Sequence, residues 1–296
     1  MCLSLSDKSQ VAPGTPTCGP FGESNTYTSA SGKVYQGTRG PFGPSFGSVD
    51  WLITNANSNY NALEVTYRYS ARRAEFLAGY TYAKSLDNSS SISDQLVPTN
   101  YRLTYGLSAF DIRHNIVASA RYELPFETLF KVSNRLTKGW EISGIARFAS
   151  GLPVTFQNNS DNSLLGTGPD GVNAFLADLP QMNSGSLHLN GNPRGGSPYF
   201  NTSLFSVQPL GTPGNVPRRF FSGPGMSNFD LAASKSIPLR ESSTLQFRLE
   251  AFNAFNHAQF FGPNTVNATL PAGSTFGLIT SADAPRLVQA ALRISF

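Results

Sequence analysis

The chain has 296 residues, with 22 Lys and Arg against 18 Asp and Glu and a formal net charge of +4. Charged residues make up 14% of it and aromatic residues 12%, whereas ordinary soluble domains carry about 25% charged residues. No run approaches the ~20 apolar residues of a membrane-spanning helix, and the scattered basic residues form no stripe that would bind nucleic acid. The composition therefore favours a β-rich chain, either a soluble β-sandwich or a membrane β-barrel with strands of alternating polarity.

Residues 1–59 form a polar, loop-rich segment that precedes the patterned part of the chain. Its first residues, MCLSLSDKSQ, show neither the basic region nor the apolar core of a secretory signal peptide. Cys2 and Cys18 both lie in this segment. A disulfide between them, in an oxidising compartment, and a pair of free thiols are both open alternatives.

Seven segments in residues 60–296 alternate apolar and polar residues with a period of two, which predicts strands with one apolar face. They are residues 60–70, 75–84, 113–124, 139–150, 227–237, 243–255 and 286–296. Residues 26–36 offer a weaker eighth strand. The last segment ends on an aromatic residue, and its apolar face consists of Val288, Ala290, Leu292, Ile294 and Phe296.

The connections between these segments alternate in length. Two are predicted to be tight turns, at 71–74 and 238–242, and the third–fourth connection is intermediate. Three are long and rich in Gly, Asn, Ser and Pro, at 85–112, 151–226 and 256–284. An antiparallel up-and-down meander with short turns at one end and long loops at the other is typical of outer-membrane barrels. A soluble sandwich has no physical reason to separate its loops in this way.

Motifs that would indicate an enzyme or a metal site lack their required context. GPSFG at 43–47 matches G-x-S-x-G, but Pro44 and neighbouring glycines replace the strand and helix that flank a catalytic serine. GTGPDG at 166–171 has a proline where a dinucleotide-binding helix would begin. The histidines His114, His188 and His257 have no ligand spacing, and the oxygens of 161–170 lack calcium-loop register. We therefore expect no enzyme, no cofactor and no metal.

Several phrases occur in an order that resembles a known family: GYTYAKSLDNSS, DIRHNIVASARYELPF, GWEISGIARFASGLPVT, LQFRLEAFNAFNHAQF and the closing FGLITSADAPRLVQAALRISF. They are similar to the C-terminal part of the barrel of Oar-like TonB-dependent outer-membrane receptors, from about residue 35 to the end. The resemblance implies an all-β, antiparallel portion of a transmembrane barrel with about 7–8 strands. Such a fragment is not closed on its own, and 1–59 then corresponds to an extracellular loop.

The same resemblance implies a location in the outer membrane of a Gram-negative bacterium. It implies outer-membrane lipid and the barrel-assembly machinery as partners, with the terminal aromatic strand as the insertion signal. The TonB system is a partner where the whole protein carries a plug, which this chain does not show. The implied role is binding and uptake of a nutrient, either a carbohydrate or a peptide.

A ligand would be bound by the long loops. The candidate loop aromatics are Tyr101, Tyr105, Phe175, Tyr199 and Phe200, which we expect to be offered to the outside. Aromatics near the strand ends fit interfacial girdles better than a sugar platform; they are Tyr67, Tyr80, Tyr82, Tyr122, Trp140 and Phe148. Two other classes stay open: a non-transporting surface or adhesion protein on the same barrel, and a soluble β-sandwich binding module.

Overall fold

The computed structural model describes most of the chain from residue 54 onward. The described residues are 26–28, 34–36, 54–91, 94, 102, 104–159, 178–189, 191–209, 212, 214–240, 243–270, 273 and 275–296. Cys2, Cys18, Tyr101 and Phe175 lie outside them, as do the motifs at 43–47 and 166–171.

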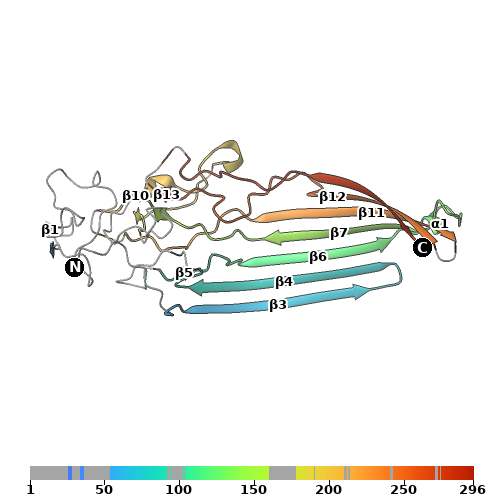
Figure 1. The fold of residues 1–296 in the computed structure, drawn as a ribbon, viewed down its shortest axis with the longest axis horizontal. Coiled ribbons are helices and arrows are strands. Elements are labelled where there is room, and N and C mark those ends of the chain that lie inside the picture. Colours follow the sequence, from blue (N-terminus) through green and yellow to red (C-terminus); the bar gives the residue numbers. More distant parts are fainter. Residues whose placement is uncertain are drawn as a thin grey trace.

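The described part is dominated by one antiparallel sheet (Figure 1). Its long strands are β3 (Ser58–Ser70), β4 (Ala74–Asp87), β6 (His114–Glu123), β7 (Trp140–Ala149), β11 (Met226–Arg240), β12 (Ser243–Phe252) and β14 (Leu287–Ser295). Each pairs with the next one along the chain, and β5 (Gly106–Leu107) adds a short piece beside β4. All seven predicted strands and the meander are confirmed, and among the described residues β3 and β14 are unpaired on their outer sides.

Several details differ from the sequence prediction. β11 reaches Arg240, inside the turn predicted at 238–242, and β4 reaches Asp87, inside the loop predicted at 85–112. The weak strand at 26–36 does not join the main sheet, because β1 (Thr26–Thr28) and β2 (Val34–Gln36) pair with each other. The strand predicted to reach 255 ends at Phe252, because Asn253 has a positive φ of 48°. Asn tolerates this left-handed conformation, and its side chain bonds both backbone polar groups of His257.

The connections separate by length, as predicted. In Figure 1 the turn from β3 to β4 and the connection carrying helix α1 (Phe126–Leu129) lie at the same end as the C-terminus. The long connections after β4, β7 and β12 emerge at the opposite end (Figure 1). The first turn is tight because the backbones of Ala71 and Ala74 bond each other across two residues. We call these ends the short-turn end and the long-loop end.

The strand register gathers apolar side chains on one face of the sheet. Residues opposite each other in paired strands lie on the same face. Tyr67, Ala78, Ala118, Ala146 and Phe229 are opposite one another in successive strands. The other face carries an equivalent row with charged and polar side chains: Glu75, Arg121, Ser143, Ala232, Glu250 and Gln289. We call these the apolar face and the polar face.

The buried core lies in the long loops rather than against the sheet. Two short pairings organise these loops, β8 (Gln157–Asn158) with β13 (Thr269–Leu270) and β9 (Gln181–Met182) with β10 (Phe205–Ser206). Two 3-10 turns, at Pro193–Gly195 and Thr202–Leu204, lie between β9 and β10 in the chain. The loop core consists of Val154, Phe156, Phe200, Leu204, Phe205, Val216, Val266, Ala268, Leu270 and Phe276.

Candidate functional site

The apolar face has large side chains near its two ends and small ones between. Tyr80, Tyr82 and Phe148 lie toward the long-loop end, and Tyr122 and Trp140 toward the short-turn end. Between them a shallow hollow of about 600 Å³ is lined by small side chains and the larger residues at its rim. Large residues of this face stay uncovered, among them Leu292 with 68% of its surface exposed. Such a face needs an apolar surrounding, because uncovered apolar surface is costly in water.

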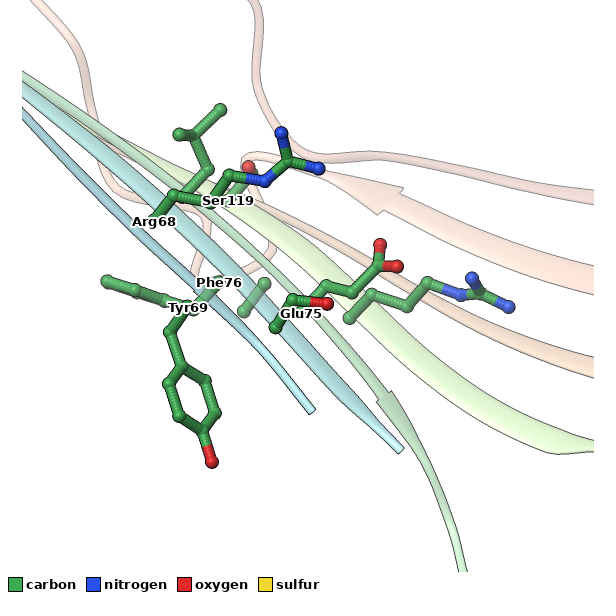
Figure 2. Close-up of a pocket in the computed structure, with 9 residues that line it drawn as sticks. Arg68, Tyr69, Glu75, Phe76 and Ser119 are labelled. Atoms are coloured by element: carbon green, nitrogen blue, oxygen red, sulfur yellow. The ribbon is translucent and has the colours of Figure 1, made fainter. Parts of the chain in front are cut away.

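The polar face carries charges that pair with one another. The guanidinium of Arg121 donates to Glu141 at 2.7 Å, and Arg248 contacts Glu250 at 2.6 Å. Near the edge strand, a second hollow of about 360 Å³ lies among residues of β3, β4 and β6. In Figure 2, Arg68 and Ser119 lie on one side of these strands and Tyr69 points away on the other. The hollow is an open furrow along the sheet, so it does not enclose a ligand.

The long loops form one packed structure, which we call the cap. Phe156 is fully buried and stacks on Phe205 with ring centroids 4.7 Å apart. Phe200 meets Phe156, Phe205 and Phe276 edge-on at 5.2–5.5 Å. Because these rings come from the loops after β7 and β12, the core ties loops that are far apart in the sequence into one body.

Four charged side chains join the long loop after β4, the first in the chain, to this cap. This ionic cluster consists of Asp87, Asp94, Arg218 and Arg219. Arg218 is fully buried; it ion-pairs with Asp87 and donates to Asp94 at 2.7 Å. Arg219 donates to Asp94 at 2.5 Å and to the hydroxyl of Thr155 at 2.9 Å. Two positive and two negative charges therefore balance in a site that is closed to solvent, which is the condition for burying ions at all.

The cluster lies on the polar side of the sheet. Asp87 is the last residue of β4 and is in phase with Glu75 and Leu77, which belong to the polar face. The hydroxyl of Ser90 donates a hydrogen bond to the carboxylate of Asp87 at 2.7 Å and accepts one from the backbone amide of Ala109 at 2.8 Å. The cap is thus fastened over the end of the polar face.

Burial and pairing act in opposite directions on these ionised groups. Burial alone would raise the pKa of Asp94, but the hydrogen bond from Arg219 and the charges of Arg219 and Arg218 outweigh it, so the pKa lies below its usual value. Burial lowers the pKa of Arg218, against the attraction of Asp94 and Asp87. The pairing keeps Asp94 charged at neutral pH.

The predicted ligand-binding aromatics have different environments. Tyr105 is 42% exposed and so is available to a ligand. Tyr199 is partly buried, packs on Phe221 with centroids 5.7 Å apart, and has a pKa raised by burial. Phe200 was expected to face outward, and this is wrong, because its ring is fully buried in the loop core. Some aromatic residues of the long loops, such as Phe200, therefore form the core of the cap and are not available to a ligand.

The ionic cluster and the loop core were not foreseen from the sequence. Asp87 and Arg218 are 131 residues apart, and no local spacing connects them. The adjacent pairs Arg218-Arg219 and Phe220-Phe221 in a glycine- and proline-rich loop were the available signal. Among the residues that the structure describes, no group of three His, Cys, Asp or Glu side chains lies together as a metal site would require.

The fold defines a class of protein: an antiparallel sheet with one uncovered apolar face, one charged face, short turns at one end and folded loops at the other. The chain matches the family model described as an outer membrane beta barrel domain over residues 5–289, and it belongs to that family. No characterised protein and no solved structure matched the chain. Within the described residues, no helix is long and apolar enough to cross a membrane.

Family membership and the sheet topology together settle three expectations. The protein is an outer-membrane β-barrel protein, so its apolar face is the lipid-facing face. Short turns lie on the periplasmic side of such barrels and long loops outside the cell, so the cap is extracellular. The soluble β-sandwich alternative is wrong, because the long described strands form one sheet rather than two packed layers.

Proposed function

We propose that this chain is the barrel part of a TonB-dependent outer-membrane receptor that binds a nutrient and takes it up. The ordered phrases that resemble those of Oar-like receptors support the receptor class, and membership of the outer-membrane barrel family agrees with it. The chemistry of the long loops suits a carbohydrate or a peptide. Energy for uptake would come from the TonB system acting on a plug of the whole protein.

One observation carries this proposal: the extracellular cap is fastened to the long-loop end of the polar face. Asp87 projects from that face and holds Arg218 of the longest loop. A barrel that only displayed loops for adhesion would have no need to fold them over its own interior. A receptor that admits a ligand needs such a cover, because the cover can bind the ligand and then release it inward.

The ligand surface would combine the outer parts of the cap. Tyr105 is exposed in the long loop that carries Asp94, and Phe110 in the same loop is 63% exposed. Exposed aromatic rings stack on sugars and pack against peptide side chains, which the buried rings of the loop core cannot do. Arg194 lies over the ring of Phe260 at 5.9 Å and adds a positive charge to this outer surface.

Uptake by whole cells tests the proposal. Cells that carry the gene in its native setting are given fluorescent oligosaccharides and peptides, with and without an uncoupler of the proton gradient. We expect at least one probe to accumulate in the periplasm, and an uncoupler to abolish this accumulation. Tyr105→Ala should raise the probe concentration needed for half-maximal accumulation. Saturable binding of the probes with no energised accumulation would instead support the non-transporting surface protein.

Assembly provides a separate test of the partners. Phe296 directly follows β14 and is 97% exposed. We propose that this strand is the signal read by the barrel-assembly machinery. Phe296→Ser should lower the amount of protein in the outer membrane, while Ser295→Thr on the polar face should leave it unchanged. Equal amounts of the two variants would contradict the role of Phe296.

A further inference from the structure

The connection between β6 and β7, residues 124–139, lies outside the barrel wall. The indole of Trp140 donates to the carbonyl oxygen of Leu136 at 2.8 Å, and the ammonium of Lys235 donates to the same oxygen at 3.2 Å. Trp140 and Lys235 are opposite each other and belong to the apolar, lipid-facing face. The connection is therefore folded against the lipid side at the periplasmic end, whereas the cap covers the polar side at the other end.

The connection has a defined structure. The side chain of Asn134 accepts the amides of Leu136 and Thr137, and Thr137 donates back to the carbonyl of Val132 at 2.6 Å. Gly139 has a φ of 74°, and its carbonyl accepts the amide of Ser236 at 2.8 Å. These bonds fix which side chains point away from the sheet.

The side chains that point away are unusually apolar for a short connection. Exposed fractions are 69% for Leu129, 60% for Phe130, 47% for Val132 and 77% for Leu136. Their apolar surface continues the lipid-facing band of β7 and β11 through Trp140. Leaving four large apolar residues in water is unfavourable, and burying them in the lipid interface removes that cost.

Basic residues alternate with these apolar ones. Lys131, Arg135 and Lys138 are all exposed. The acidic residue of the connection, Glu127, is paired with Arg73 of the first turn at 2.8 Å. The exposed part of the connection therefore carries a net positive charge beside an apolar surface, a combination that binds anionic lipid head groups.

We propose that residues 126–138 form an interfacial anchor that binds anionic phospholipids of the periplasmic leaflet. Leu129, Phe130 and Leu136 enter the acyl region, and Lys131, Arg135 and Lys138 bind the phosphate groups. Lys235 and Trp140, on the lipid-facing face of the barrel wall, hold the anchor against that face through the carbonyl oxygen of Leu136. The inference rests on the barrel and its orientation, and not on what the receptor transports.

Site-specific fluorescence tests the apolar half of the proposal. An environment-sensitive dye is attached to Leu136→Cys in a Cys2→Ser/Cys18→Ser background, and the full chain is folded into phosphatidylcholine vesicles with brominated acyl chains. We expect quenching at position 136, as at the lipid-facing control Leu292→Cys, and none at Ser119→Cys on the polar face. Quenching at 292 without quenching at 136 would overturn the anchor.

The charged half has its own readout in the native membrane. The whole protein is extracted from outer membranes in lipid discs without detergent, and the lipids that stay with it are quantified. The variant Lys131→Gln/Arg135→Gln/Lys138→Gln should lose several-fold of its bound phosphatidylglycerol. The matched control Arg68→Gln/Arg147→Gln/Arg293→Gln changes the net charge equally on the polar face and should keep it. Equal lipid content in the two variants would overturn the head-group contacts.

Discussion

Arg218 and Asp94 form a buried ion pair at 2.7 Å between residues 124 positions apart in the sequence. Removing one partner of such a pair leaves the other charge buried alone, at a cost of about 3–5 kcal/mol. We therefore expect Arg218→Met to open the cap locally, seen as faster hydrogen exchange in residues 85–91 and 214–225. Arg194→Met removes an exposed arginine of the same loop and serves as the control. Unchanged exchange in Arg218→Met would show that the loop core alone holds the cap.

Acid should open the cap through Asp94. The pKa of Asp94 is lower in the folded protein than its usual value of 3.8, so its pairs stabilise the cap at every pH above the ordinary aspartate range. This contribution is lost as the pH falls through the lowered pKa. Cleavage of the cap by an acid-active protease should therefore increase as the pH falls below 3.8. The increase should be smaller in Asp94→Asn, because the cap of that variant is already open at neutral pH. Equal pH profiles for the two proteins would contradict this role.

The loop core should depend on Phe156. Its fully buried ring contacts three other phenylalanine rings. Replacing a buried Phe by Ala typically costs about 3–5 kcal/mol, so Phe156→Ala should make the long loops sensitive to protease while the sheet keeps its heat-modifiable mobility. Phe255→Ala removes a ring that is 67% exposed and should have little effect. Loss of the whole barrel in Phe156→Ala would mean that cap and sheet unfold together.

The two faces of the last strand predict opposite tolerance to charge. Leu292 is opposite Phe247 on the lipid-facing side, and Arg293 is opposite Gln246 on the polar side. Leu292→Arg should destabilise the inserted protein by ~1–3 kcal/mol, because the depth-dependent cost of a charge in lipid applies there. Arg293→Gln should be tolerated. Urea unfolding in vesicles measures both, and a larger loss for Arg293→Gln would reverse the face assignment.

Two glycines differ in what they require: Gly139 needs a positive φ and a close backbone approach, whereas Gly79 needs neither. A side chain on Gly139 would meet the carbonyl oxygen of Ser236, and its φ of 74° disfavours other residues. Gly139→Ala should cost about 1–3 kcal/mol of stability. Gly79, within β4, has open space around its missing side chain, so Gly79→Ala should change stability by less than about 1 kcal/mol. Thermal unfolding in detergent compares them, and equal losses would remove the proposed constraint at Gly139.

The strands could be predicted because their information is local. The alternation in residues 60–70 or 286–296 fixes a strand and its two faces without reference to the rest of the chain. The contrast between tight and long connections then fixes the meander. The early end of β12 was missed because it depends on one residue, Asn253, whose side chain bonds a turn instead of continuing the ladder.

The cap could not be predicted because its contacts are non-local. Glycine- and proline-rich stretches look like open loops, and only the fold brings Asp94 beside Arg219. Phe200 shows the resulting error: an aromatic in a polar loop was expected to be offered outward, but it is part of the loop core. The anchor at 126–138 was missed for a similar reason, since its lipid-side position depends on Lys235, which follows Lys138 by 97 residues.

The distance along the chain between Asp87 and Arg218 has a consequence for the order of assembly. Two long strands of the main sheet, β6 and β7, lie within this interval. Closing so long a chain segment before they pair is entropically unfavourable. The ionic cluster therefore forms after the central sheet has been built. Newly exported chains should pass through a stage with a complete sheet and open outer loops. A protease added outside the cell should cut the loops of molecules at this stage and leave mature molecules intact. Protease resistance of the cap therefore reports that the sheet of the barrel wall has already formed.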